Sequence, residues 1–192
     1  RKFEKKAKGD KYGMKIFWLY SISMFFVALG FISWINISFI LKASNIFPDY
    51  SIATLYTIAM LANALIAFPI GLMYDRFGLV SLLIAPISSI LIIPFILSYN
   101  FASAIIASIL WGIVMAVYES NARAAIADIL SESKRAFGYG VFGLSFGIAW
   151  MLGSIIYGYL YEISPISMIY FSLTVEIVAL IFLLLTILKT KR

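Results

Sequence analysis

Long runs without a charged residue are the feature that most restricts how this chain can fold. Residues 51–74 form a run of 24 residues without a charge, and residues 77–118 form another of 42. A helix of about 20 apolar residues is enough to cross the hydrocarbon core of a bilayer. The chain is 63% hydrophobic and 12% charged, whereas soluble domains are about 45–50% apolar and about 25% charged. We therefore expect an all-α membrane protein.

Charges and turn residues divide the chain into six apolar runs, each long enough for a transmembrane helix. The expected helices cover residues 15–41, 51–74, 79–97, 101–130, 137–161 and 165–188. Pro69, Pro86 and Pro94 fall inside the second and third helices and are expected to bend them. The predicted organisation is a basic cytoplasmic segment over residues 1–14, a six-helix transmembrane domain over residues 15–188, and a basic cytoplasmic tail over residues 189–192.

Basic residues predict the orientation, because cytoplasmic loops of membrane proteins are enriched in Lys and Arg. Lys42 stands alone on one side of the six predicted crossings. The remaining basic residues all fall on the other side: Arg1, Lys2, Lys5, Lys6, Lys8, Lys11, Lys15, Arg76, Arg123, Lys134, Arg135, Lys189, Lys191 and Arg192. We expect a multi-pass protein of the cell (plasma) membrane with both termini in the cytoplasm. The positive charge marks a membrane side rather than a binding face, so we expect no nucleic-acid partner.

The end of the second expected helix is echoed at the end of the fifth. "GLMYDRFG" (71–78) and "GYLYEISP" (158–165) share the pattern Gly-x-x-Tyr-acid at an offset of 87 residues. The same offset places the first helix close to the fourth and the third within the sixth. Because three crossings are an odd number, the second trio must be inverted, and inverted repeats are typical of secondary transporters. The sequence therefore predicts two inverted three-helix repeats.

The composition and the sequence context argue against a catalytic site or a cofactor site. The chain has no Cys and no His, which removes thiolate metal sites and the commonest general base. "GYGVFG" (138–143) fits a dinucleotide motif but follows no strand, and "GLSFG" (143–147) fits a nucleophile elbow but has no His partner. Small residues along one face of the fifth helix instead favour close helix packing: Ala136, Gly140, Gly143, Gly147, Ser154 and Gly158. We expect no enzyme activity, no metal and no cofactor.

The stretch "GLMYDRFG" resembles the loop motif Gly-x-x-x-Asp-Arg-x-Gly of the major facilitator superfamily, which follows the second helix of each six-helix half. The matching positions are Gly71, Asp75, Arg76 and Gly78. Leu79 and Val80 stand where basic residues usually follow. Residues 118–162 resemble the family's fourth helix, basic loop and Gly-rich fifth helix, and the basic start resembles the loop that joins the two halves. The resemblance implies the C-terminal six helices of a twelve-helix major facilitator fold.

The resemblance also implies a gating role for the motif, in which its acid forms a latch at the cytoplasmic face. A carboxylate at a membrane edge interacts well with a helix N-terminus or with an arginine. Arg123 is the expected partner of Asp75 within this chain, and the other half of the transporter is the alternative. Gly78 is expected to supply the turn geometry. A simpler interpretation is that Asp75 and Arg76 solvate a tight turn.

Two acids lie inside the expected helices. Glu119, near the cytoplasmic end of the fourth helix, either pairs with Arg123 at i,i+4 or serves in gating or proton coupling. Glu176 lies close to the membrane midplane, where an acid is a functional hypothesis by default. The resemblance places the sixth helix at the periphery, which favours a helix–helix hydrogen bond or a protonated packing role for Glu176 over coupling.

The resemblance places the first, second, fourth and fifth helices around a central cavity. Polar and aromatic residues of these helices are candidates for substrate binding: Ser33, Asn36, Asn63, Trp111 and Trp150. Ordinary packing is the alternative for each tryptophan. A strongly anionic substrate is disfavoured, because this chain places no Arg or Lys deep in an expected helix.

Together these features predict a secondary active transporter of a small solute that works by alternating access, with this chain as its C-terminal half. Its partners would be a small-molecule substrate, the lipid bilayer, and the N-terminal six-helix half of the same protein or a second copy of itself. The alternative is a non-transporting membrane sensor or scaffold with a similar fold.

Overall fold

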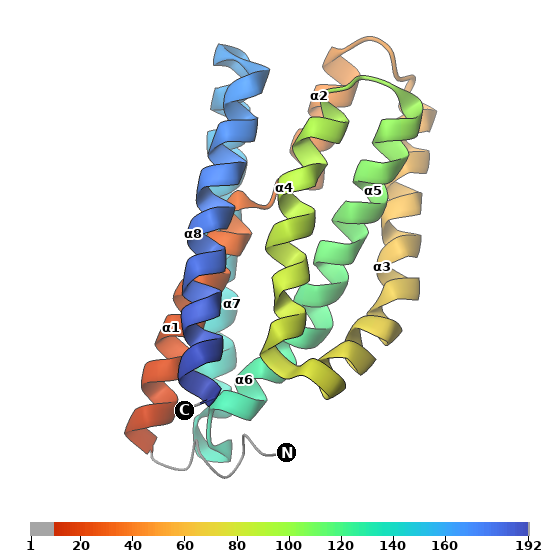
Figure 1. Cartoon of the computed structure of the whole chain (residues 1–192). Coiled ribbons are helices and arrows are strands. Elements are labelled where there is room, and N and C mark those ends of the chain that lie inside the picture. The colour runs from red at the N-terminus through yellow and green to blue at the C-terminus, as the bar shows by residue number, and fades with distance from the viewer. Residues whose placement is uncertain (1–9, 192) are drawn as a thin grey trace.

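The helices form a bundle in which most of them run nearly along one axis (Figure 1). The computed structural model describes residues 10–191, and every regular element in this range is helical. The elements are α1 (Asp10–Gly30), α2 (Trp34–Ala43), α3 (Asp49–Phe77), the 3₁₀-helix η1 (Gly78–Leu83), α4 (Ile84–Ile96), α5 (Phe101–Ala116), the π-helix η2 (Val117–Ala122), α6 (Arg123–Ile129), α7 (Glu132–Ile163) and α8 (Pro165–Lys191). The all-α fold expected from the sequence is present throughout these residues. Residues 1–9 of the predicted basic segment lie outside the described range.

Five helical stretches between residues 10 and 191 are long and apolar enough to cross a membrane. They are Tyr12–Ala43, Asp49–Ile96, Phe101–Ile129, Glu132–Ile163 and Pro165–Thr190. The second stretch has 48 residues, about twice what one crossing needs, and Figure 1 shows α3 and α4 running in opposite directions. The count of six crossings and the inverted repeat stay predictions.

The reversal between α3 and α4 depends on a glycine. Gly78 has φ 60° and ψ −136° and donates its backbone N–H to the carbonyl oxygen of Tyr74. A residue with a Cβ is strained in this region of the backbone map, whereas glycine is not. Gly78 therefore supplies the turn at the end of α3, as the sequence indicates. Figure 1 also shows α3 bending towards this end, and Pro69 lies inside it.

The helices are arranged in two groups. One contains α1, α7 and α8, the other contains α3, α4 and α5, and the groups meet where α4 packs against α8. α1 packs against α7 and α8, and α5 lies between α3 and α4. In the group of α3, α4 and α5, helices α5 and α3 approach closely at Gly112 of α5, where a Cβ would collide with the carbonyl oxygen of Ala59 on α3. Helices in a membrane associate by such close packing, because lipid offers no hydrophobic driving force between them.

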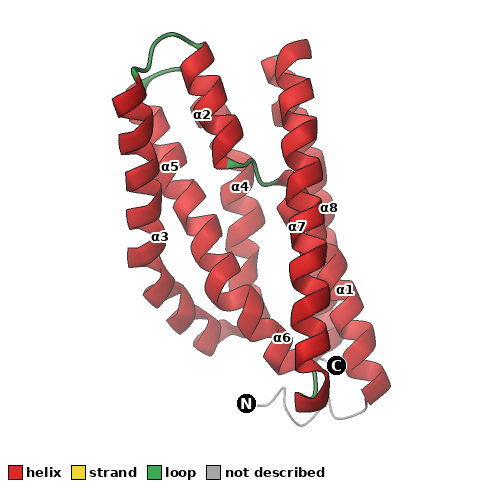
Figure 2. Ribbon diagram, turned by 180° about the vertical axis from the view of Figure 1, so that it is seen from behind, coloured by secondary structure: helices red, strands yellow, loops and turns green. Residues whose placement is uncertain are grey.

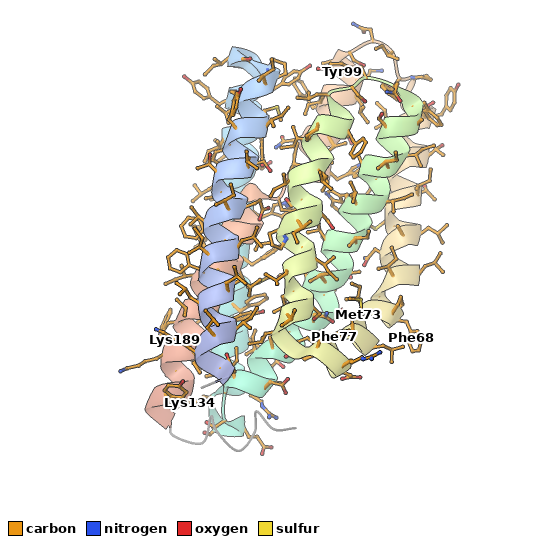
Figure 3. The ribbon with its side chains drawn as sticks, viewed as in Figure 1. Phe68, Met73, Phe77, Tyr99, Lys134 and Lys189 are labelled. Carbon is orange, nitrogen blue, oxygen red and sulfur yellow. The ribbon has the colours of Figure 1, made fainter. Side chains whose placement is uncertain are left out.

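The two ends of the described chain meet at one end of the bundle. The Tyr12 hydroxyl, near the start of α1, donates to the Lys189 carbonyl oxygen near the end of α8 at 2.7 Å. Figure 3 shows Lys134 at the same end as Lys189. Lys42 lies instead in the last turn of α2, where it forms an ion pair with Asp49 at the start of α3. Both side chains of this pair are exposed, so it contributes little to stability.

Candidate functional site

The first expected helix, over residues 15–41, is wrong as a single helix, because the structure breaks it into α1 and α2. α1 ends at Gly30 and α2 begins at Trp34, and Figure 2 shows the connecting loop at about mid-height of the bundle. Ser33 caps α2: its backbone is extended, and its side chain accepts from the backbone N–H of Asn36 at 3.4 Å. A glycine followed three residues later by a capping serine is a recognised helix stop and start, but the continuous hydropathy concealed it.

The backbone carbonyl groups left without a helical partner at the break accept hydrogen bonds from side chains of other helices. The Gly30 carbonyl oxygen accepts from the Tyr157 hydroxyl of α7 and, at 3.5 Å, from the Ser89 hydroxyl of α4. The Ile32 carbonyl oxygen accepts from the indole N–H of Trp111 on α5 at 3.1 Å. Irregular backbone at membrane depth is tolerated only where protein or water satisfies it. The break is therefore a built feature of the interior rather than a frayed end.

A cavity of about 360 Å³ lies beside this break. It is bounded by the break itself and by α2, α3, α5 and α7, and its lining residues are Ser33, Trp34, Ile35, Tyr56, Trp111, Gly147, Trp150, Met151 and Ser154. The ring centroids of Trp34 and Trp111 are 5.4 Å apart, and those of Trp34 and Tyr56 are 5.2 Å apart. Four of the nine lining residues are thus aromatic, and Ser33, Tyr56 and Ser154 contribute hydroxyl groups.

Three of the five predicted cavity residues line this cavity, namely Ser33, Trp111 and Trp150. Asn36 lies one turn further along α2 and supports the wall, since its amide Nδ2 donates to the Ser154 carbonyl oxygen at 3.0 Å and to the Ser154 hydroxyl at 3.2 Å. The Ser33 and Ser154 hydroxyls are themselves 3.0 Å apart. These bonds fix α2 against α7 at the polar edge of the cavity.

Asn63, the fifth predicted cavity residue, does not line the cavity. Its Nδ2 donates to the Glu119 carboxylate at 3.1 Å, which joins α3 to the π-helix η2. No ion pair joins Glu119 to Arg123 among the described residues, although the sequence offers that pairing. A π-helix adds a residue to the turn and so changes which side chains face each other, and such turns are frequent at functional sites.

The motif residues Asp75 and Arg76 are exposed at the end of α3. The Arg76 guanidinium lies 5.3 Å from the ring centroid of Phe77, which Figure 3 shows at the lower end of the bundle. Within residues 10–191 no hydrogen bond or ion pair connects Asp75 with Arg123, so the intrachain latch is not formed in this conformation. The contact present at this end is instead between the Tyr74 hydroxyl and the Asp128 carboxylate, at 2.8 Å.

The sequence reasoning did not single out Asn121, which the structure places at the centre of the motif region. Its side chain is 1% exposed. Its Nδ2 donates to the Ile70 carbonyl oxygen of α3 at 3.2 Å and to the Ser81 hydroxyl of η1 at 3.0 Å. A signal was available, because an amide in an apolar helix must find a partner on another helix. Asn121 therefore fixes both arms of the Gly78 turn to η2.

Glu176 is fully buried in α8, at 0% exposure. It packs directly on Gly30, the last residue of α1. Ser89, Ser172 and Tyr157 are its polar neighbours. The structure thus places this acid against the break, although it does not line the cavity. No group of three or more Asp or Glu side chains that could hold a metal ion occurs among the described residues.

Comparison with known proteins agrees with the motif and the helical fold. The sequence pattern of the Major Facilitator Superfamily matches residues 16–192. The chain belongs to this superfamily. Members of the superfamily are membrane transporters rather than enzymes, and the apolar helices make this chain an integral, multi-pass membrane protein.

Relatives of this superfamily member occur in bacteria and archaea. Uncharacterized proteins of Mycobacterium bovis and Mycobacterium tuberculosis are 33% identical over 165 residues, which is 86% of this chain and 40% of each relative. An uncharacterized MFS-type transporter of Methanocaldococcus jannaschii is 31% identical over 113 residues, which is 58% of this chain and 28% of that protein. The chain thus spans well under half the length of these relatives. No solved structure matches significantly.

Proposed function

We propose that this chain is the C-terminal half of a secondary active transporter that moves a small solute by alternating access. The observation that carries the proposal is the aromatic cavity of about 360 Å³ beside a broken helix inside the bundle. Transporters place their binding sites near the membrane midplane, at helices that are interrupted there. Membership of a superfamily of transporters supports the same function.

The lining favours a solute with a flat or apolar face. Four aromatic rings contribute to it, and none of its described lining residues is charged. The hydroxyls of Ser33, Tyr56 and Ser154 are among the polar groups available to orient a polar substituent. Small-molecule sites commonly combine a mostly apolar lining with a few polar groups that fix orientation. A strongly anionic solute would find no compensating cation in this half.

The N-terminal six-helix half is the proposed partner, and a second copy of this chain is the less favoured one. More than half of each mycobacterial relative lies outside the matched region, which leaves room for such a half. Along α7, several glycines have no atom within 4 Å of an added Cβ, namely Gly140, Gly143, Gly147 and Gly158. A face of small residues suits the close approach of another helix.

The proposed orientation puts both ends of the described chain in the cytoplasm, in the cell membrane. Lys134 and Lys189 lie at one end of the bundle (Figure 3), and Lys42 is the basic residue at the α2–α3 loop. This distribution follows the enrichment of cytoplasmic loops in basic residues. Asp75 at the same end is then free to contact the other half, which is the remaining form of the proposed latch. The two trios of crossings are proposed to be inverted repeats.

Alternating access is tested by labelling a single cysteine in the cavity from each side of the membrane. The 192 residues contain no cysteine, so Met151→Cys is unique in this region once any cysteine elsewhere in the native-length protein is replaced. Met151 lines the cavity and is 57% exposed. The control is Ile181→Cys on α8, at 52% exposure, which we place facing lipid. Both proteins are reconstituted in sealed vesicles and treated with a membrane-impermeant maleimide.

An alternating cavity predicts that Met151→Cys reacts from either face of the membrane, because each conformation opens it to one side. Ile181→Cys should react from neither face. Reaction of Met151→Cys from one face alone would indicate a permanently one-sided cleft. That result would favour a non-transporting sensor or scaffold over a transporter.

A further inference from the structure

The buried acid Glu176 has no described partner for its charge. Its side chain is 0% exposed, and neither carboxyl oxygen has a hydrogen-bond partner among the described residues. An added Cβ on Gly30 would lie 2.8 Å from its Oε1, so the carboxyl group rests directly on the last turn of α1. α8 packs against α1, α4, α7 and η1, and the groups that face Glu176 must come from these elements.

Those elements bring no cation to Glu176. α7 contributes Tyr157, α4 contributes Ser89, and α1 contributes the backbone of Gly30. η1 and α4 contain no charged or titratable side chain. Lys189 of α8 lies 13 residues away, roughly 20 Å along the helix. An ionised carboxylate buried without a partner is strongly disfavoured, so the neutral acid is the form that this arrangement accommodates.

A proton fits the site better than a metal cation does. Unwound carbonyl groups of broken helices hold Na⁺ in some transporters. Here the Gly30 carbonyl oxygen already accepts from the Tyr157 and Ser89 hydroxyls. The oxygens left without a partner are the two of Glu176 and the hydroxyl of Ser172. A proton needs only one of the Glu176 oxygens and removes the charge, whereas a hard cation takes about six oxygen ligands, more than the three left without a partner here.

We propose that Glu176 is the proton-binding residue of this transporter, and that release of its proton shifts the break between α1 and α2. The proposal rests on the transport function and adds its coupling ion and the place where that ion binds. On release, the carboxyl O–H bond breaks and the proton passes to water that reaches the interior. The carboxylate formed then needs hydrogen-bond donors.

The nearest donors are the hydroxyls that now hold the break. Tyr157 and Ser89 donate to the Gly30 carbonyl oxygen while Glu176 is neutral. A carboxylate is a stronger acceptor than a backbone carbonyl, so these hydroxyls turn from Gly30 to Glu176 once the proton leaves. Gly30 then loses its donors, and the end of α1 is free to move relative to Ile32, which Trp111 still holds. Ser33 lines the cavity and is hydrogen-bonded to Ser154. A change in the protonation of Glu176 is therefore transmitted to the cavity through the three residues that follow Gly30.

The protonation state is tested directly by infrared spectroscopy of the native-length protein. We expect a C=O stretching band of a protonated carboxyl group at neutral pH, shifted in D₂O and insensitive to Na⁺. Glu176→Gln should lose this band. Glu162→Gln is the matched control, because Glu162 is an exposed acid at the end of α7, and this variant should retain the band. Absence of the band in the wild type, or its removal by Na⁺, would overturn the proposal without the need for any variant.

Coupling to the cavity is tested by the labelling of Met151→Cys as a function of pH. We expect the preferred labelling face to change between acid and alkaline pH, and Glu176→Gln to lose this dependence and keep the acid pattern. Labelling from both faces that ignores pH, or that keeps its pH dependence in Glu176→Gln, leaves transport standing and refutes the inference. Labelling from one face alone refutes transport itself, and with it the coupling.

Discussion

Gly112 is a position where one added methyl group should disturb the packing of two helices strongly. α5 passes α3 so closely that a Cβ on Gly112 would lie 2.9 Å from the Ala62 Cβ and 2.9 Å from the Asn63 backbone nitrogen. It would also press on the Ala59 carbonyl oxygen. Carbon atoms in ordinary contact are about 3.5–4.0 Å apart, so Gly112→Ala must separate the helices by roughly 0.6–1 Å. These are backbone and Cβ atoms, which cannot rotate away.

The free energy follows from two opposing terms. Overpacking a close contact costs about 1–3 kcal/mol, and a gap of this size also weakens neighbouring contacts by about a quarter to a half. Alanine in place of glycine inside a helix gains about 0.5–1 kcal/mol. We expect Gly112→Ala to lower the free energy of unfolding by about 1–2 kcal/mol.

The assay is equilibrium unfolding of the native-length protein in mixed micelles, followed by far-UV circular dichroism. Gly71→Ala is the matched control, because Gly71 also lies inside a helix, α3, and a Cβ there has no atom within 4 Å. This variant should be unchanged or more stable by up to about 1 kcal/mol. If Gly112→Ala is as stable as Gly71→Ala, α3 and α5 do not approach as closely as the structure shows, and the reasoning fails.

Two further substitutions test the polar contacts that hold the irregular segments. Ser33→Ala removes the N-cap of α2 and should cost about 0.5–2 kcal/mol, seen as faster amide hydrogen exchange in the first turn of α2. Asn121→Ala leaves the Ile70 carbonyl and the Ser81 hydroxyl without their donor and should cost about 1–3 kcal/mol. A proteolysis assay should then cut the Gly78 turn faster, and an unchanged rate would show that Asn121 does not fix the turn.

The positions of the helices follow from hydropathy, because lipid imposes apolar side chains over a fixed length. The fifth expected helix, at residues 137–161, corresponds to α7 at Glu132–Ile163, and the sixth, at residues 165–188, corresponds to α8 at Pro165–Lys191. The helices are longer than the apolar runs, since a helix continues into the polar region beyond the lipid. Hydropathy therefore indicates the part of each helix that contacts lipid, but not the residue at which the helical hydrogen bonds end.

Hydropathy fails where the backbone changes inside an apolar run. The break after Gly30 and the π-helix η2 lie within expected single helices, because an apolar sequence satisfies lipid whether or not its backbone is regular. What makes the break stable is the set of donors on α4, α5 and α7, such as Trp111, which lies 79 residues from its acceptor Ile32. Contacts between residues so far apart follow from the fold and cannot be derived from local pattern.

The candidate site was predictable in part, because its residues were indicated by the resemblance but their contacts were not. The resemblance to the superfamily indicated which helices face a cavity, and Ser33, Trp111 and Trp150 do line one. It could not indicate that Asn63 turns instead to Glu119. Which polar group pairs with which depends on rotation of each helix about its own axis, and Pro69 and η2 alter that rotation in α3 and in the α5–α6 segment.

α7 holds the break from both sides, and this gives it a particular position in the proposed mechanism. Ser154 bonds Ser33 and Asn36 at the start of α2, and Tyr157 bonds Gly30 at the end of α1. Residues three apart on a helix are neighbours on one face, so a single turn of α7 contacts both halves of the broken helix. While these bonds are made, a movement of α7 is therefore transmitted to both halves. Because the glycine face of α7 is the surface proposed to meet the other half of the transporter, a shift of that half would act on the cavity wall and on the contacts around Glu176 together.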